Sequence, residues 1–241
     1  MEALVPAFAL ALARVAGLAF TAPLLGDAST SRRVRLVFVV AIAAMLAPLR
    51  LGAALSPALP PALALELAAG LIAGTCARFV MARVETAGHL IGLSLGLGFA
   101  AQYQPSSGAS ASTTGILANT LGGLAFLAAG GLEAVVVAAA GPTPSRPDDV
   151  LLRPDLRAVG ADALRAGLVL AGPVVAAALV ANVGLALMNR AAPAINVFSI
   201  NLIAVLLIGG LVVAAVGPQF VAGALASART ATEPLLRGGT P

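Results

Sequence analysis

The sequence predicts an all-α protein that crosses a membrane with several helices. Hydrophobic residues make up 60% of its 241 residues, whereas charged residues make up only 10%. A water-soluble domain of this size carries about 25% charged residues, so this chain has too few polar side chains to cover a globule in water. Its mean hydropathy of +1.02 and its long apolar runs therefore indicate that lipid, or apolar protein within lipid, surrounds most of the surface.

Several apolar runs are long enough to cross a hydrocarbon core of about 30 Å, which requires about 20 helical residues. Three such segments are Pro6–Leu25, Gly167–Met188 and Ile195–Val216, and a fourth, Ile116–Ala140, contains Glu133 near its end. Shorter runs at residues 36–49, 67–77 and 90–101 are typical of buried, re-entrant or broken helices. The sequence therefore predicts kinked and broken helical hairpins beside complete spans.

Composition divides the chain into four regions. Residues 1–140 are expected to form an N-terminal helical region. Residues 141–165 are rich in proline and in charges of both signs, so they are expected to be an aqueous loop. Residues 166–217 are expected to form a helical hairpin that turns at Asn189–Pro193, because Pro193 ends a helix. Residues 218–241 are expected to be a frayed tail.

Ionisable side chains interrupt the apolar runs of the first half of the chain. They are Arg14, Glu66, Arg78, Arg83, Glu85 and His89. A charge at the centre of a bilayer costs about 2.5–3.5 kcal/mol on insertion scales, so each must face protein or water. Glu85 is expected to pair with Arg83 or with an arginine of another subunit. We therefore expect these helices to lie in a larger assembly, in which Arg14 and Glu66 make buried polar contacts.

The residue types argue against several other classes of protein. The net charge of +4 comes from scattered arginines without any lysine, a pattern of membrane flanks rather than of a nucleic-acid interface. Cys76 is the only cysteine, which excludes a disulfide framework within the chain. Glu85 and His89 share a helix face, but one histidine without further ligands predicts no metal or cofactor. Ser106 or Ser107 with His89 lacks the Gly-x-Ser-x-Gly elbow of serine hydrolases, so no catalytic residue is predicted.

Small residues mark one face of the helix that contains Glu85. Gly88, Gly92 and Gly96 recur at every fourth position, which allows close packing against a neighbouring helix, and Gly98 is an expected bend. The apolar pattern then ends in a polar segment: Gln102, Tyr103, Gln104, Pro105, Ser106, Ser107 and Gly108. Between intramembrane helices, such a segment must lie in protein or line a water-filled cavity. It is predicted to be a re-entrant plug or gate, with a plain surface loop as the alternative.

Four stretches resemble the FliR family of type III export-gate proteins. Residues 12–17 with 21–25, and the basic residues 32–36, resemble the family's first helix and the start of its second. Residues 86–92, continuing to 98–100, are similar to its central glycine-rich helix. The most distinctive match is Asn189-Arg190-Ala191-Ala192-Pro193-Ala194-Ile195-Asn196-Val197-Phe198. After Phe198 the chain departs from the family, since Asn201-Leu202-Ile203 stand where many relatives have Gly-Phe-Pro. The Asn189–Arg190 pair favours the flagellar branch over the injectisome branch.

The resemblance implies a non-enzymatic subunit of the flagellar export gate, in the bacterial inner membrane at the flagellar basal body. In this family one copy completes a ring of FliP subunits, with FliQ packed outside and FlhB, and also FlhA, as further partners. Unfolded flagellar proteins pass through the channel, and membrane lipid surrounds part of the helical cone. By the same resemblance, residues 1–140 are FliP-like, residues 166–217 are FliQ-like, and the plug falls at about residues 101–110. Buried polar or assembly contacts are implied for Asn189, Arg190, Pro193 and Asn196.

Two transporter classes are the alternatives. A small-molecule secondary transporter also uses broken helices with charges at mid-membrane, but it would typically show inverted repeats, and the two halves of this chain show no convincing internal symmetry. A permease subunit of an ATP-driven transporter requires a cytoplasmic coupling helix, which residues 151–164 could supply.

Overall fold

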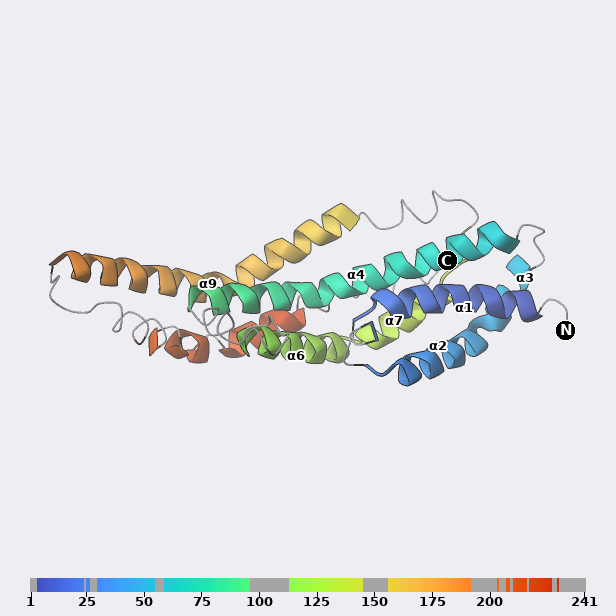
Figure 1. Ribbon diagram of the computed structural model, residues 1–241, viewed down its shortest axis with the longest axis horizontal. Coiled ribbons are helices and arrows are strands. Elements are labelled where there is room, and N and C mark those ends of the chain that lie inside the picture. Colours follow the sequence, from blue (N-terminus) through green and yellow to red (C-terminus); the bar gives the residue numbers. More distant parts are fainter. Residues whose placement is uncertain are drawn as a thin grey trace. The chain divides into compact units, whose positions relative to one another are not determined.

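The computed structural model describes residues 4–23, 25–26, 30–54, 59–95, 113–144 and 156–191, together with residues 203, 207–208, 210–215, 217–226 and 229. Every regular element within these ranges is a helix, which confirms the predicted all-α class. The principal helices (Figure 1) are α1 (Leu4–Thr21), α2 (Arg32–Leu46), η1 (Ala47–Arg50), α3 (Leu51–Ala54), α4 (Leu59–Ser94), α6 (Thr113–Ala128), α7 (Gly131–Ala140) and α9 (Leu156–Ala191).

Three helical segments of the described chain are long and apolar enough to cross a membrane: Leu4–Thr21, Leu59–Ser94 and Arg157–Met188. The first and third coincide with most of the predicted spans Pro6–Leu25 and Gly167–Met188. They confirm a polytopic membrane protein. The predicted span Ile195–Val216 falls largely outside the described residues.

Helix α4 differs from the buried, re-entrant or broken helices predicted for this part of the chain. The short runs at residues 67–77 and 90–101 were not expected to form a complete span, yet α4 is one helix of 36 residues that joins them as far as Ser94 and is long and apolar enough to cross a membrane. Arg78, Arg83 and Glu85 interrupt the apolar pattern, but charged side chains are good helix formers and do not break the backbone. Pro60 and Pro61 lie in the first turn, where a missing N–H is tolerated.

Two further segments differ from the sequence prediction. The loop expected at residues 141–165 ends earlier, because α9 begins at Leu156. Its charged residues Arg157, Asp162 and Arg165 are exposed on a regular helix. The expected tail also differs, because residues 217–226 are helical and Ala224 is buried. In both segments, charge or a nearby proline indicated loop, whereas the spacing of apolar residues was compatible with helix.

The predicted span Ile116–Ala140 is a broken helix. Segments Asn119–Ala128 and Gly131–Ala140 meet at a bend of 64°. The bend lies at Gly130, whose φ of 76° is in the left-handed region that glycine adopts readily. Gly131 follows, and a Cβ there would come 2.5 Å from the ring atoms of Phe126. The buried Phe126 ring therefore occupies the space that a side chain at position 131 would need.

The chain divides into two compact units that alternate along the sequence. Unit 1 comprises the described parts of residues 1–81, 126–162 and 228–241, and unit 2 comprises those of residues 82–125 and 163–227. In unit 1, α1 packs against α2, η1, α3 and α7, as Figure 1 shows for the blue helices. Leu10, Val15 and Leu18 of α1 are buried and form the centre of this packing.

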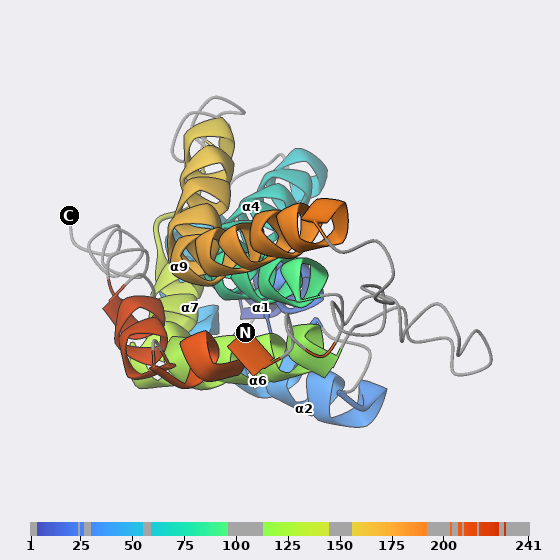
Figure 2. The ribbon, with the colours of Figure 1, turned by 90° about the vertical axis from the view of Figure 1, so that its left-hand side faces the viewer.

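Unit 2 is built around the second half of α4 and most of α9. Its apolar core contains Ala87, Ile91, Leu95, Ala171, Val174, Ala181 and Leu185. The view of Figure 2 shows α4 and α9 side by side. Gly167 allows this approach, because a Cβ on it would come 2.8 Å from Cβ of Thr86 and 2.9 Å from the carbonyl oxygen of Arg83.

Candidate functional site

Helices α1 and α4 cross through glycines that the sequence analysis did not single out. A Cβ on Gly17 would come 2.5 Å from the carbonyl oxygen of Leu67. A Cβ on Gly70 would overlap the carbonyl oxygen of Arg14, and one on Gly74 would overlap the hydroxyl of Thr21. Because these three glycines each lie against backbone atoms of the other helix, the two backbones approach more closely than any other residue type permits.

This close crossing places Glu66 beside two arginines inside unit 1. Nε of Arg14, on α1, lies 2.5 Å from Oε2 of Glu66, on α4. Nη1 of Arg50, at the end of η1, lies 3.0 Å from Oε1 of the same carboxylate. The three side chains are buried, and that of Glu66 is 0% exposed. We call Arg14, Arg50 and Glu66 the buried cluster.

The end of α7 supplies further oxygens to the buried cluster. Arg14 donates through Nη1 to the carbonyl of Gly141 at 2.6 Å and through Nη2 to that of Pro142 at 2.9 Å. Arg50 donates through Nη2 to the carbonyl of Ala139 at 2.9 Å and through Nη1 to the hydroxyl of Thr143 at 2.6 Å. The cluster therefore joins α1, η1 and α4 to the exit of α7.

The charges of the buried cluster are balanced by a carboxylate and a helix end. Two guanidinium groups face one carboxylate, which leaves one positive charge to be stabilised. The last carbonyls of a helix carry about half a negative charge, and the C-terminal end of α7 is where both arginines donate. Burial lowers the pKa of Arg50 from its ordinary value, and the charge of Glu66 acts in the opposite direction. An arginine remains protonated under such a shift.

The sequence analysis expected Arg14 and Glu66 to be buried polar residues, and the structure pairs them with each other. It did not identify Arg50, which ends a short apolar run beside Pro48 and has the pattern of a membrane flank. The sequence did contain a signal for Arg50: Glu66 is the only carboxylate between residues 28 and 84. A buried carboxylate requires a cationic partner, and Arg50 is the arginine that most closely precedes Glu66 in the sequence.

The glycine face predicted on α4 lies in unit 2. Gly88 and Gly92 are buried, on the part of α4 that packs against α9 through Ala87 and Ile91. Gly96 and Gly98 lie outside the described residues.

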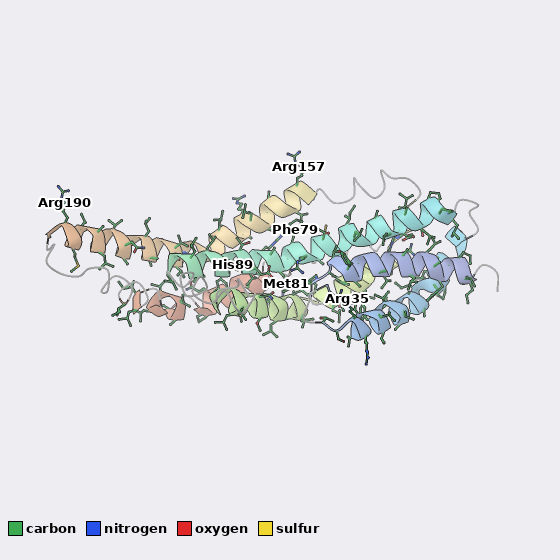
Figure 3. All side chains as sticks on the ribbon, in the orientation of Figure 1. Arg35, Phe79, Met81, His89, Arg157 and Arg190 are labelled. Atoms are coloured by element: carbon green, nitrogen blue, oxygen red, sulfur yellow. The ribbon has the colours of Figure 1, made fainter. Side chains whose placement is uncertain are left out.

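Glu85 is half-buried and His89 is exposed on α4, and Figure 3 labels His89 on that helix. Within the described part of the chain, no group of three or more His, Cys, Asp or Glu side chains is arranged to hold a metal.

Asn189 lies in the last turn of α9. Arg190 follows it and is exposed, with its side chain pointing away from the rest of α9 (Figure 3).

The predicted plug residues Gln102–Gly108 lie outside the described residues, as do Pro193 and Asn196 of the hairpin motif. Their assigned roles stay predictions.

Apolar helices of membrane-crossing length, with ionisable side chains paired inside the protein, define this chain as a polytopic helical membrane protein. The chain belongs to the bacterial export proteins, family 1, which it matches over residues 5–229. This family membership confirms the resemblance drawn from the sequence motifs.

Two relatives of this chain share one name, flagellar biosynthetic protein FliR. The flagellar biosynthetic protein FliR of Escherichia coli (strain K12) is 32% identical over 219 residues, which cover 86% of this chain and 82% of that protein. The flagellar biosynthetic protein FliR of Pectobacterium carotovorum subsp. carotovorum is 26% identical over 204 residues, covering 81% of this chain and 78% of that protein.

Proposed function

We propose that this chain is a subunit of the flagellar type III protein export gate and helps to form the channel for unfolded flagellar proteins. The observation that carries this proposal is the match to a bacterial export family over nearly the whole chain. Relatives described as flagellar biosynthetic proteins support the flagellar branch. The membrane-crossing helices fit a component embedded in a membrane, which we assign to the inner membrane at the flagellar basal body.

The proposed role is structural rather than enzymatic. The buried cluster supports this role, because its three side chains form ion pairs with one another and its arginines donate hydrogen bonds to oxygens of the same chain. Such a network fixes helices in place and offers no reactive group to a substrate. FliP, FliQ, FlhB and FlhA are the proposed partners.

The exposed apolar surface also supports a place in an assembly. Large hydrophobic side chains of α9 are exposed along its length, among them Val169, Val180 and Leu187. An exposed apolar surface of this extent requires lipid or other proteins as its surroundings. Glu85 and the residues of the Asn189–Asn196 motif are proposed to contribute to contacts with those proteins.

Native mass spectrometry of the detergent-extracted protein tests the proposed function. The full-length chain is co-expressed with FliP and FliQ of its own source, with a tag on this chain alone. The expected result is a hetero-oligomer that contains all three proteins. A small homo-oligomer that transports a solute unaided, or a complex with an ATPase, would contradict the proposal.

The packing role proposed for the glycine face has its own test. Gly92 is buried on α4, so Gly92→Leu is expected to lower the recovery of the complex by overpacking. Normal recovery of the complex with Gly92→Leu would contradict the packing role proposed for the glycine face.

We further propose that Gln102–Gly108 form the plug of the idle channel. Deletion of Gln104–Gly108 is expected to increase ion leakage through the assembled gate. The control is to show that the deleted protein still co-purifies with its partners. Unchanged leakage in a fully assembled gate would count against the plug and would leave the export role of the subunit intact.

A further inference from the structure

The outward face of α2 is apolar along most of its length. Its exposed residues include Val34, Val37 and Met45, which are 59%, 64% and 61% exposed. The opposite face packs against α1, and it contains the buried Ala43 and Leu46. Exposed positions recur at the spacing of one helix face, namely Arg33, Val34, Val37, Val40, Ala41, Ala44 and Met45. We call these residues the α2 face, and Arg32 is exposed beside them in the first turn.

The α2 face is cationic at one end only. Arg32 and Arg33 are exposed, and within the described residues neither of them forms an ion pair. The first turn contains no acidic residue. A helix N-terminus already carries about half a positive charge, so arginines there are unfavourable unless an anion lies nearby. Arg32 and Arg33 therefore place two positive charges at the start of α2 for which the described residues provide no ion pair.

The order of chemistry along α2 matches one leaflet of a bilayer. Residues 36–49 contain no ionisable side chain. From Arg33 to Met45 the helix rises about 18 Å, at 1.5 Å per residue, whereas a complete hydrocarbon core is about 30 Å thick. Pro48 then lies in η1, which ends the straight helix. The apolar part of α2 therefore has about the length of one leaflet.

We propose that the α2 face is a docking surface for an anionic phospholipid. Arg32 and Arg33 bind the phosphate and the anionic headgroup, and the acyl chains lie along Val37, Val40 and Met45. A partner protein would also cover an apolar stripe. Lipid is favoured because the cations and the apolar residues follow each other in the order of headgroup and acyl chain. This inference is independent of the export role.

The test measures lipid binding to the purified full-length chain, together with the proteins that co-purify with it, in a neutral detergent. Phosphatidylglycerol or phosphatidylcholine is titrated in, and the bound lipid is counted by native mass spectrometry. The variant is R32Q/R33Q. Each arginine near an anionic membrane surface contributes about 1 kcal/mol, so the double variant is expected to bind phosphatidylglycerol roughly 30-fold more weakly. Its binding of phosphatidylcholine is expected to stay unchanged.

The matched control is R157Q/R165Q, which removes two exposed arginines from α9. It is expected to retain the preference for phosphatidylglycerol. The preference of the unmodified chain is expected to weaken in high salt, because exposed charges are screened; this measurement needs no variant. Equal losses in both double variants, or no preference for phosphatidylglycerol in the unmodified chain, would overturn the proposal. Loss of a co-purifying protein from R32Q/R33Q with lipid binding unchanged would assign the α2 face to that protein instead.

Discussion

Glu66 lies within ion-pair distance of both Arg14 and Arg50, so a single carboxylate stabilises two buried cations. Removing one member of a buried ion pair costs about 3–5 kcal/mol, because the remaining charge is left without a partner in a medium that solvates it poorly. In this protein the loss of Glu66 would leave two such charges. At the scale of single residues, the stability of unit 1 therefore depends most strongly on Glu66.

Replacement of Glu66 by Gln is the first prediction. The change keeps the shape of the side chain and removes its charge, so it is expected to destabilise the protein by at least about 3 kcal/mol. The measurement is thermal unfolding of the detergent-extracted protein. Glu133→Gln is the control, because this exposed carboxylate in the first turn of α7 interacts only with a helix end, a contribution of about 0.3–1 kcal/mol. Equal effects of the two substitutions would contradict the importance assigned to the buried cluster.

Arg50 also supports a prediction at the residue scale. Its guanidinium donates through Nη1 to Glu66 and Thr143 and through Nη2 to Ala139. Lysine keeps the charge but has one nitrogen in place of this planar fork. Arg50→Lys is therefore expected to lower the free energy of unfolding by about 1–3 kcal/mol, the cost of leaving a buried acceptor unsatisfied. The same unfolding measurement checks this value, and a fully stable Arg50→Lys protein would show that charge alone is sufficient.

At the scale of helices, the crossing of α1 and α4 depends on Gly70 and Gly74. A methyl group at either position would overlap atoms of α1, so the helices would have to separate. Since the buried cluster spans the same two helices, separation at the crossing also lengthens the ion pair between Arg14 and Glu66. Packing and electrostatics are therefore coupled at this pair of helices.

Gly70→Ala is expected to destabilise the protein by about 1–3 kcal/mol, which is the usual cost of overpacking. The control is Gly184→Ala on α9, where nothing lies within 4 Å of the added carbon. There the higher helix propensity of alanine is expected to stabilise the helix by up to about 1 kcal/mol. Opposite signs in thermal unfolding are the predicted outcome. A neutral Gly70→Ala protein would show that α1 and α4 can shift without cost.

The bend between α6 and α7 depends on Gly130. An L-residue with a side chain costs roughly 1–2 kcal/mol in the left-handed region, and asparagine tolerates it better than alanine. Gly130→Ala is therefore expected to lower the unfolding temperature more than Gly130→Asn does. Asparagine is the larger of the two side chains, so crowding would make Gly130→Asn the less stable variant, and the comparison therefore separates backbone strain from crowding. The same unfolding temperature for both would indicate that the bend does not require this conformation.

At the scale of the whole molecule, the sequence predicted the class of protein and part of the site. Low charge and long apolar runs were sufficient for the membrane helices α1 and α9. Arg14 and Glu66 were recognised because a charge inside an apolar run must find a partner. The choice of partner could not be predicted, because Arg14 and Glu66 are separated by many residues and meet only through the glycine crossing. Helix α4 was not predicted as one complete span, since hydropathy detects charge and not the continuity of a backbone.

The buried cluster has a consequence for the order in which the protein is made. Arg14, Arg50 and Glu66 leave the ribosome before residues 139–143, which provide the remaining oxygens. A nascent chain that ends before those residues therefore has two guanidinium groups for one carboxylate and cannot bury them without cost. Until α7 has been synthesised, the two guanidinium groups lack the acceptors that residues 139–143 supply in the folded protein. Burial of the first helices is therefore more costly in the nascent chain than in the complete unit.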